Sequence, residues 1–373
     1  MSNSITKKQK AIIFYQYLPP WRIDVFNEMA KYYDMTIVFT NADCEGFTYN
    51  RNELLGKLSN IKTIFLNTCI RIGSRPVHLG ISKLIKKEKP DVIFTHEYSP
   101  TSIMIAFYKQ IRRFKYKLYV TTSDNVAMAE TATGLKAKAR EYVLNHADGI
   151  IVYSSSVKEW YSQHFPKIKI DICPNIQNPQ TLLSYRKSFI HYTDEYIKKF
   201  NLKDCNIILY TGRLVEVKGL DLLLAAFADA DIANYKLVLV GDGNQKSKLQ
   251  NLTKTLGIES NVIFAGYYSG EALYAWYDLA NYFILPSIYE PFGAVINEAL
   301  VYGCPVVVSQ FIGALDFVTS ENGTIFNPIN HQEFVDTLRN ACKKYAGQNK
   351  SERKNLMPCS FSDYVIAFKN INS

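Results

Sequence analysis

The sequence lacks the features that define several large protein classes. Its seven cysteines are an odd number with no CxxC spacing, which argues against a disulfide framework or a zinc site and for a reducing compartment. No apolar run approaches the roughly 18 residues that a membrane-spanning helix needs. There is no low-complexity segment and no nucleic-acid-binding motif, so we expect a globular protein with no nucleic-acid partner.

The first residues, MSNSITKKQKAIIFYQYLPPW, combine a basic stretch with a short apolar run. A signal peptide can begin in this way, but no small-x-small cleavage site follows, and Pro19 and Pro20 come directly after the run. We therefore predict a first β-strand over 11–16 and a cytoplasmic protein.

Short β-branched and aromatic runs recur along the chain, with helical patterns between them. Several runs are apolar at every position, which is typical of parallel strands covered on both faces. With 373 residues, the chain is long enough for two domains of the usual size. We predict an α/β protein with two Rossmann-like, doubly wound domains facing a central cleft. The runs lie at 11–16, 35–40, 62–66, 91–95, 117–122, 149–154, 168–173, 206–212, 235–241, 261–266, 282–286, 305–309 and 323–327.

Two carboxylates stand in the otherwise apolar stretch EPFGAVINEAL, at 290–300. The helix predicted there is apolar around nearly its whole circumference, so it should be buried. Because an unpaired buried carboxylate is costly, Glu298 should form a salt bridge, bond to the backbone, or accept hydrogen bonds from ligand hydroxyls. Glu290 precedes the helix, next to free N–H groups around 292–294 that can bind an anion.

A second stretch, TGRLVEVKG at 211–219, suits a diphosphate. A strand ends at Gly212, and Arg213 and Lys218 follow it. Arginine can hold two phosphate oxygens at once, and lysine acts as a point charge. An arginine and a lysine at this spacing most often lie in a solvent-exposed loop that binds no ligand. However, ligands of open parallel sheets bind at such strand ends. Two glycine turns, VGDGN and AGYYSG, should shape the cleft, and Tyr267 in the second could lie against a nucleobase.

GRLVEVKG, LVLVGDG, VIFAGYYS and EPFGAVINEALVYGCPVV, in this order, resemble the donor domain of the family 4 (group 1) retaining glycosyltransferases, which have the GT-B fold. The resemblance covers about residues 201–330, and KPDVIFTHEYSP and ADGIIVYSSSVKEWY look like the family's first domain. It implies metal-independent transfer, without a cofactor, from a UDP- or GDP-sugar to a glycan or lipid-linked acceptor in bacterial surface polysaccharide synthesis (capsule, lipopolysaccharide or O-antigen).

The resemblance also implies domain bounds and site residues. It implies an acceptor-side domain over 1–175, a linker region over 176–200, a donor domain over 201–355, and a last helix over 356–373 that crosses back to the first domain. Glu290 would contact the donor sugar and act as a catalytic residue. Glu298 would bind the ribose, and the loop at 212–218 would bind the diphosphate. The matched positions are Gly212, Arg213, Lys218, Glu290, Phe292, Gly293, Ala294 and Glu298.

Two departures from the family concern the first half. Many members have glycines after the first strand, where this sequence reads YLPPWR, and a histidine after the strand at 117–122. Here that strand is followed by Ser123 and Asp124. The catalytic role of the histidine could pass to Asp124, to His96 after the strand at 91–95, or to no residue.

Two other functions remain open. A sugar-nucleotide 2-epimerase would use two such domains but should have several acids and histidines around the sugar, and no such cluster is evident. An inactive, transferase-like binding protein would not need the cations and carboxylates of 211–219 and 290–300.

The positive charge is confined to the first half. Residues 1–175 hold 25 Lys and Arg against 15 Asp and Glu, a net of +10, whereas residues 176–373 hold 18 against 19, a net of −1. Two basic runs, 83–90 and 109–117, could bind an anionic membrane surface, with Ile111, Phe114 and Tyr116 interleaved in the second. We therefore expect a cytoplasmic protein that can lie peripherally at the inner face of the cell membrane.

Overall fold

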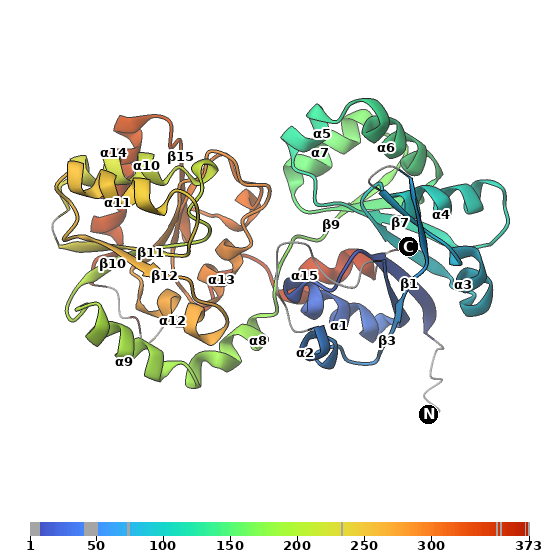
Figure 1. Cartoon of the computed structure of the whole chain (residues 1–373), viewed down its shortest axis with the longest axis horizontal. Coiled ribbons are helices and arrows are strands. Elements are labelled where there is room, and N and C mark those ends of the chain that lie inside the picture. Colours follow the sequence, from blue (N-terminus) through green and yellow to red (C-terminus); the bar gives the residue numbers. More distant parts are fainter. Residues whose placement is uncertain are drawn as a thin grey trace. The chain divides into compact units, whose positions relative to one another are not determined.

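The chain folds into two compact units in the computed structural model (Figure 1). The structure describes residues 8–40, 51–72, 75–232, 234–347, 350, 353–369 and 371. The first unit comprises Met1–Ile176 with Phe361–Ser373, and the second comprises Gln177–Ser360. Residues 1–7, the start of the stretch considered as a signal peptide, lie outside the described residues.

The first unit is built on a parallel sheet of seven strands, in the order β3-β2-β1-β6-β7-β8-β9. Each strand coincides with an expected apolar run, because burial on both faces needs apolar side chains throughout. The strands are β1 Gln9–Tyr15, β2 Tyr33–Phe39, β3 Ile61–Phe65, β6 Val92–His96, β7 Lys117–Thr121, β8 Gly149–Val152 and β9 Lys169–Ile172. The helices are α1 Ile23–Tyr32, α2 Arg51–Gly56, α3 Ile81–Glu88, α4 Pro100–Gln110, α5 Val126–Thr131, α6 Gly134–His146, α7 Ser155–His164 and α15 Phe361–Val365.

A short antiparallel hairpin in the first unit was not predicted. It pairs β4 Cys69–Ile72 with β5 Arg75–His78. The segment CIRIGSRPVH has neither a continuous apolar run nor a strict alternation, so its periodicity does not mark strands. The hairpin matters because it carries His78, which is buried.

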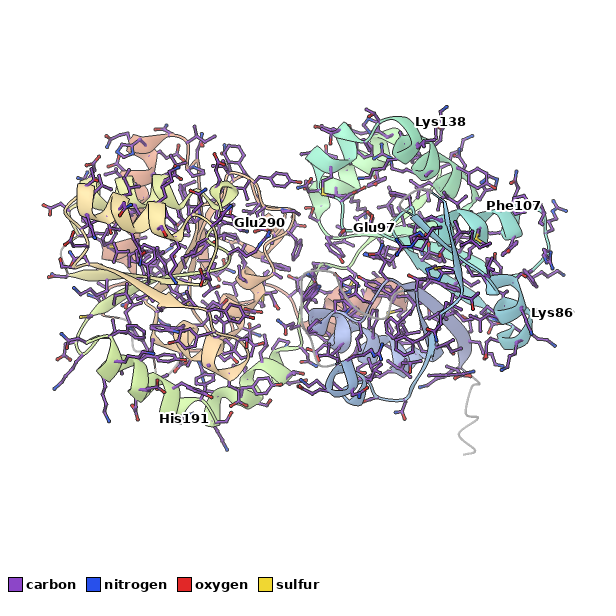
Figure 2. All side chains as sticks on the ribbon, viewed as in Figure 1. Lys86, Glu97, Phe107, Lys138, His191 and Glu290 are labelled. Carbon is purple, nitrogen blue, oxygen red and sulfur yellow. The ribbon has the colours of Figure 1, made fainter. Side chains whose placement is uncertain are left out.

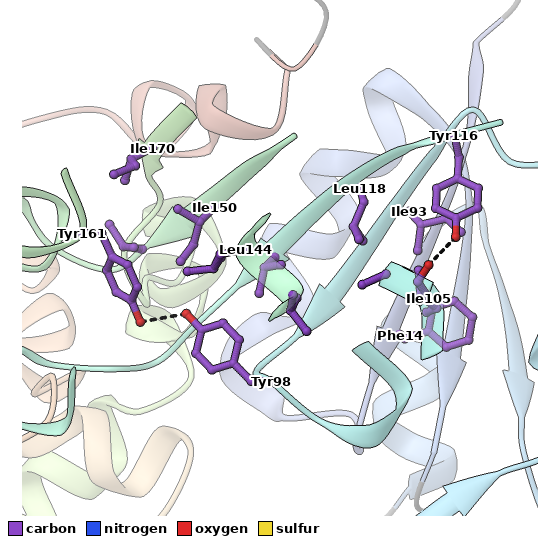
Figure 3. Packing of buried hydrophobic residues seen from close by; sticks show 14 of the residues in the cluster. Phe14, Ile93, Tyr98, Ile105, Tyr116, Leu118, Leu144, Ile150, Tyr161 and Ile170 are labelled. Carbon is purple, nitrogen blue, oxygen red and sulfur yellow. Dashed lines mark hydrogen bonds between the residues drawn. The ribbon is translucent and has the colours of Figure 1, made fainter. Parts of the chain in front are cut away.

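The core of the first unit is drawn in Figure 3. Its strand residues include Ile93, Leu118 and Ile150, none of which is exposed. Two buried tyrosines, Tyr98 and Tyr161, donate and accept a hydrogen bond between their hydroxyl groups at 2.7 Å (Figure 3). A buried hydroxyl needs such a partner, so this pair brings polar groups into an apolar core at little cost.

The second unit has a parallel sheet of six strands, in the order β12-β11-β10-β13-β14-β15. In α10 the spacing of four apolar residues places them on one face of the helix, and all four are buried. They are Leu220, Leu223, Leu224 and Phe227. The strands are β10 Asn206–Thr211, β11 Tyr235–Val240, β12 Val262–Gly266, β13 Tyr282–Leu285, β14 Val306–Ser309 and β15 Gly323–Phe326. The helices are α8 Pro179–Ser184, α9 Ile190–Lys199, α10 Leu220–Ala230, α11 Lys246–Thr255, α12 Glu271–Leu279, α13 Val295–Val301 and α14 His331–Tyr345.

The segment expected as a linker, 176–200, is largely helical and folds with the second unit. Tyr196 of α9 stacks on Trp276 of α12, with the ring centroids 4.4 Å apart, and donates a hydrogen bond to the Ala272 carbonyl at 2.9 Å. Because these contacts bury aromatic surface, α9 behaves as part of the domain rather than as a flexible connection.

The last segment belongs to the first unit, where α15 packs against α1 (Figure 1). Tyr33 donates a hydrogen bond to the Phe368 carbonyl at 2.6 Å, and Lys117 donates one to the Ile371 carbonyl at 2.9 Å. The chain therefore leaves the first unit after Ile176 and returns to it at Phe361.

In both sheets the strand order reverses at the first strand of the unit: the chain first adds strands on one side of it and then on the other. The neighbours at these points are β1 with β6 in the first unit and β10 with β13 in the second. Ligands of open parallel sheets bind beyond the carboxyl ends of the strands at such points. The topology thus selects the loops after these four strands as candidate sites.

Candidate functional site

The loops after β10 and β13 in the second unit are held backbone to backbone. Ile288 donates its N–H to the Val217 carbonyl at 3.0 Å. Gly219 has a positive φ of 61°, and a Cβ atom there would lie 2.6 Å from the Pro286 carbonyl oxygen. Only glycine fits this close approach without strain. The two loops therefore form one surface that carries the predicted residues of 211–219 and 286–294.

Lys218 and Glu290, one from each loop, form an ion pair with each other. Their side chains are 12% and 14% exposed, respectively. The Glu290 backbone is also fixed, since its N–H bonds to the Phe311 carbonyl at 3.3 Å and its carbonyl accepts from Gly313 at 3.2 Å. The structure thus brings together two residues predicted at the donor, and it pairs the lysine with the carboxylate. Figure 2 labels Glu290.

Arg213, in contrast, is exposed at the same strand end. Its side chain makes no hydrogen bond or ion pair with the part of the chain that the structure describes, while its backbone carbonyl accepts from the Tyr210 hydroxyl at 2.9 Å. Gly212 next to it packs against the glycine turn after β11, where a Cβ on Gly241 would lie 1.8 Å from the Gly212 carbonyl oxygen. The Arg213 guanidinium is therefore available to a ligand.

Glu298 accepts two hydrogen bonds from side chains. Tyr277 donates to its Oε2 at 2.9 Å, and Gln177 donates to its Oε1 at 2.9 Å. The Tyr277 hydroxyl also lies 2.9 Å from Thr211 Oγ1, at the end of β10. Burial raises the pKa of Glu298, and the bonds from Tyr277 and Gln177 offset part of that rise. Among the described residues no cation pairs with Glu298, so neither a salt bridge nor a backbone bond accounts for it.

The segment before α13 is close to its predicted form. The helix begins at Val295, and Gly293 has a positive φ of 97°. Phe292 is buried, and its carbonyl accepts from Ala314 at 2.8 Å. The N–H groups of Gly293 and Ala294 donate to no residue among those described. As the apolar pattern predicts, most of the helix is buried, and Glu298 is partly exposed at its surface. The buried residues are Ile296, Asn297, Ala299, Leu300 and Val301.

Tyr267 lies at the turn after β12 and is 75% exposed. No ring contact or hydrogen bond holds its side chain among the described residues, so its place beside a nucleobase remains a prediction.

In the first unit, the loops after β6 and β7 bring His96, Glu97 and Asp124 to one place. Figure 2 labels Glu97. His96 stacks on Tyr15 with 4.2 Å between the ring centroids, and its Nδ1 lies 3.0 Å from Thr121 Oγ1. Its Nε2 is 3.7 Å from Glu97 Oε1. Burial lowers the pKa of His96, and the neighbouring Glu97 charge partly offsets this.

Glu97 was missed by the sequence analysis, although it follows His96 directly. Its Oε1 accepts from the Ser123 N–H at 2.7 Å and from the Ser123 hydroxyl at 2.6 Å, and its Oε2 accepts from Thr122 at 3.1 Å. The residue has a positive φ of 57°, uncommon outside glycine, and such conformations cluster at functional sites. A single glutamate after a strand is too common a pattern to mark a site.

Asp124 lies inside the protein, with a side chain only 1% exposed. Its Oδ2 accepts from the Tyr161 hydroxyl at 2.8 Å, and Lys136 Nζ is 3.7 Å from its Oδ1. Burial raises the pKa of Asp124, and the charge of Glu97 adds to the rise. Of the two first-unit carboxylates, Glu97 is the more accessible, with 26% of its side chain exposed.

The YLPPWR loop, where many family members have glycines, instead supplies a buried arginine. Arg22 is 1% exposed, donates to the Pro174 carbonyl at 3.3 Å and lies over the Tyr153 ring at 5.6 Å. It also lowers the pKa of His96, since a nearby positive charge disfavours the imidazolium. Where many family members have glycines, this chain therefore has a buried cation, Arg22.

The basic run 109–117 is less open than its sequence suggests. Tyr116 is buried and bonds to the Ile105 carbonyl at 2.7 Å (Figure 3), so the expected aromatic interleaving at the surface is wrong for this residue. Lys109 pairs with Asp148. Ile111 is 49% exposed and Phe107, at the end of α4, is 47% exposed (Figure 2).

Neither a metal cluster nor a membrane span stands out in the described ranges. No group of three or more His, Cys, Asp or Glu side chains there could hold a metal ion. Likewise, no helix within these ranges has both the length and the apolar character to cross a bilayer.

Two family models match the chain. The model of the group 1 glycosyl transferases matches residues 193–356, and the model of glycosyltransferase family 4 matches residues 31–180. An uncharacterised glycosyltransferase of Methanocaldococcus jannaschii is 30% identical over 259 residues, 65% of this chain and 64% of that protein. The lipopolysaccharide 1,2-N-acetylglucosaminetransferase of Salmonella typhimurium is 31% identical over 236 residues, 55% of this chain and 60% of that protein. The matched part is thus under two-thirds of the length of either relative.

A solved structure extends the likeness to the whole fold. The structure of the Anabaena protein HepE in complex with UDP has a TM-score of 0.70 at 17% identity and covers 97% of both chains. Together with the two doubly wound units, this likeness shows the GT-B fold. The chain belongs to the family 4, group 1 glycosyltransferases.

Proposed function

We propose that the protein transfers a sugar from a UDP- or GDP-sugar, with retention, to a glycan or lipid-linked acceptor in bacterial surface polysaccharide synthesis. The observation that carries this proposal is the group at the β10–β13 strand ends: exposed Arg213, the Lys218–Glu290 pair, and Glu298. The similarity to a lipopolysaccharide N-acetylglucosaminetransferase supports the acceptor class, and the UDP-bound neighbour supports a uridine donor.

The chemistry follows from where charge develops. Departure of the nucleoside diphosphate builds negative charge, and preorganised cations at that point lower the barrier. Arg213 is free to meet the phosphates, and Lys218 can turn to them when a donor hydroxyl replaces it at Glu290. Glu298, already an acceptor of two hydroxyl or amide donors, can accept from ribose hydroxyls.

A screen of donors tests the proposal. UDP-, GDP- and ADP-sugars would be added to the protein, with melting temperature and donor hydrolysis as readouts. A donor at about 100 times its Kd should stabilise the fold by about 2.7 kcal/mol. Stabilisation by a UDP- or GDP-sugar, with slow hydrolysis, is the expected result. The absence of any effect with all three classes would overturn the proposal.

We further propose that no metal or cofactor takes part. Two basic side chains and the N–H groups before α13 are available to balance the diphosphate, so a divalent cation has no evident task. Transfer should therefore persist in excess EDTA, measured by release of the nucleoside diphosphate. The proposal would be contradicted if EDTA abolished transfer and only the addition of Mg²⁺ or Mn²⁺ restored it.

We also propose that the first unit binds an anionic membrane surface reversibly. The lysines of α3 and of the turn after it, including Lys86, and the cations Arg112, Arg113 and Lys115 are exposed. Each such residue contributes about 1 kcal/mol near an anionic bilayer. The protein should sediment with anionic vesicles at low salt and dissociate at high salt. Reversal of Arg112, Arg113 and Lys115 to glutamate should abolish binding and leave donor hydrolysis intact.

A matched control reverses three exposed lysines of the second unit: Lys198, Lys199 and Lys203. This variant has the same change in net charge, so it should still bind the vesicles if the first-unit surface is responsible. Equal loss in both variants would mean that net charge alone drives sedimentation, and no sedimentation of the wild type would leave a soluble acceptor as the better expectation.

A further inference from the structure

The first unit contains a cavity of about 350 Å³ beyond the carboxyl ends of three strands. Gln16 follows β1, Thr40 follows β2 and Glu97 follows β6, and all three line it. The volume falls within the range of about 300–1,000 Å³ typical of small-molecule sites. The cavity therefore lies where the topology of the first sheet favours a ligand, and it is large enough for one.

His78 lines this cavity and has no partner for either ring nitrogen among the described residues. It is 3% exposed and is carried there by the β4–β5 hairpin. Burial lowers the pKa of His78, and the nearby backbone of Leu66 offsets part of this shift. The Leu66 backbone is not placed to form a hydrogen bond with either ring nitrogen. A neutral imidazole offers one donor and one acceptor. Leaving both unused in the interior is costly, so His78 is poised for a ligand that can satisfy them.

The charges around the cavity favour a neutral ligand. Glu97 accepts hydrogen bonds from Ser123 and Thr122, which hold its carboxylate in place at the wall of the cavity. Lys136, the cation of the lining, lies 3.7 Å from Asp124, which compensates it. Among the described lining residues, a phosphate would meet no net positive charge. A hydroxyl group, in contrast, can donate to Glu97 and can both donate to and accept from His78.

The remaining walls suit a sugar ring. Pro76 and Pro100 offer apolar surfaces to the C–H groups of such a ring, and Thr101 offers a further hydroxyl group. A few placed polar groups among apolar walls are the usual composition of a specific small-molecule site.

We propose that this cavity binds a neutral sugar unit of the acceptor and that His78 is a specificity-determining residue that reads one of its hydroxyl groups. The proposal rests on the proposed function for its assignment to the acceptor, whereas the binding of a neutral sugar can be measured without any transfer.

The test uses methyl glycosides of glucose, galactose, N-acetylglucosamine and N-acetylgalactosamine as probes, with the full-length protein. At least one should bind the wild type and shift the NMR signals of the His78 ring, which reports contact even if a variant fails to fold. In His78→Phe, the Kd of that glycoside should rise about tenfold or more. Because the substitution replaces an unpaired polar ring by an apolar one, its melting temperature should stay level or rise.

His146→Phe is the matched control. His146 lies on α6 in the same unit, its Nδ1 is 2.8 Å from the Tyr142 carbonyl, and it does not line the cavity, so glycoside binding should not change. The proposal is overturned if no glycoside binds the wild type, if His78→Phe binds as well as the wild type, or if inorganic phosphate binds instead and is lost in Lys136→Ala. Binding of UDP and GDP is measured in parallel, so that a failed donor site and a failed sugar cavity give different results.

Discussion

Arg213→Ala is expected to lower kcat/KM for sugar transfer by about 10²–10³, with the fold intact. If Arg213 stabilises the charge of the departing diphosphate, removing it is comparable to removing one preorganised donor at a developing charge. Arg213 is the right residue to test because its side chain is exposed and has no side-chain or backbone partner among the described residues. Its loss therefore removes a ligand contact and no contact that holds the loop. The measurement is steady-state kinetics with the donor found in the screen.

Lys218→Ala would be harder to interpret, because it would change the stability of the protein as well as its contacts with the donor. It would leave Glu290, whose side chain is 14% exposed, without its partner, and an unpaired carboxylate with little access to water destabilises the protein by itself. Arg213→Lys is the better companion, because it keeps the charge and loses the ability to hold two oxygens at once. We expect its kcat/KM to fall between the values for the wild type and Arg213→Ala.

Lys248→Ala supplies the control for charge. Lys248 is an exposed cation on α11 in the same unit and is remote in sequence from 211–219 and 290–298. Kinetics close to the wild type are expected. Arg213→Ala with near-wild-type transfer would remove Arg213 from the donor site, and an equal loss in Lys248→Ala would point to a general effect of charge.

The strands were the most predictable part of this fold. All thirteen apolar runs became strands of the two parallel sheets, because strands buried on both faces tolerate few polar residues. The β4–β5 hairpin escaped prediction because Ile70 and Arg71 lie in a short, mixed segment with no period. Two prolines and several polar residues predict a linker region over 176–200. The segment instead forms α8 and α9, and Tyr196 makes contacts that join α9 to the second unit.

The candidate site also has residues that the sequence predicts and residues that only the fold brings together. Residues in one loop, such as Arg213 and Lys218, can be found from spacing, and the pairing of Lys218 with Glu290 joins two stretches recognised separately. The hydrogen bonds of Glu97 come from residues 25 and 26 positions away, and only the sheet brings those residues together. His78 is buried by an unpredicted hairpin, so no pattern in the sequence marks it as part of a cavity.

Capping shows the limit of local patterns on a smaller scale. In the sequence, Asn330 followed by Glu333 predicts a capping box at the start of α14, and the Asn330 side chain accepts the Glu333 N–H at 3.3 Å. The Glu333 side chain, however, accepts from the N–H of Asn327 at 2.9 Å instead of returning to Asn330. The spacing located the helix start correctly, while the approach of the preceding chain decided where the carboxylate bonds.

Glu298→Gln is expected to weaken binding of the donor nucleotide about tenfold or more. A carboxylate accepts hydrogen bonds from ribose hydroxyls more strongly than an amide does, and charged hydrogen bonds contribute about 1.5–3 kcal/mol against about 0.5–1.5 for neutral ones. The ligand-free protein should be as stable or more stable, because burial already disfavours the charge of Glu298. Gln177 can turn its amide to present an oxygen to the new side chain, so no donor need face a donor. Calorimetry with the nucleotide and urea unfolding of the ligand-free protein measure the two effects.

Two further variants separate a ribose contact from a purely structural role of Glu298. Tyr277→Phe removes the hydroxyl that joins Thr211 to Glu298 and leaves the carboxylate with its bond from Gln177. If Glu298 served only to hold Tyr277, both substitutions would lower stability by similar amounts and leave nucleotide affinity alone. If Glu298 binds ribose, Glu298→Gln should have the larger effect on affinity and Tyr277→Phe the larger effect on stability. Glu259→Gln, at an exposed position of the same unit, makes the same change in net charge and should alter neither. A loss of several kcal/mol of stability in Glu298→Gln with unchanged affinity would assign Glu298 to the fold.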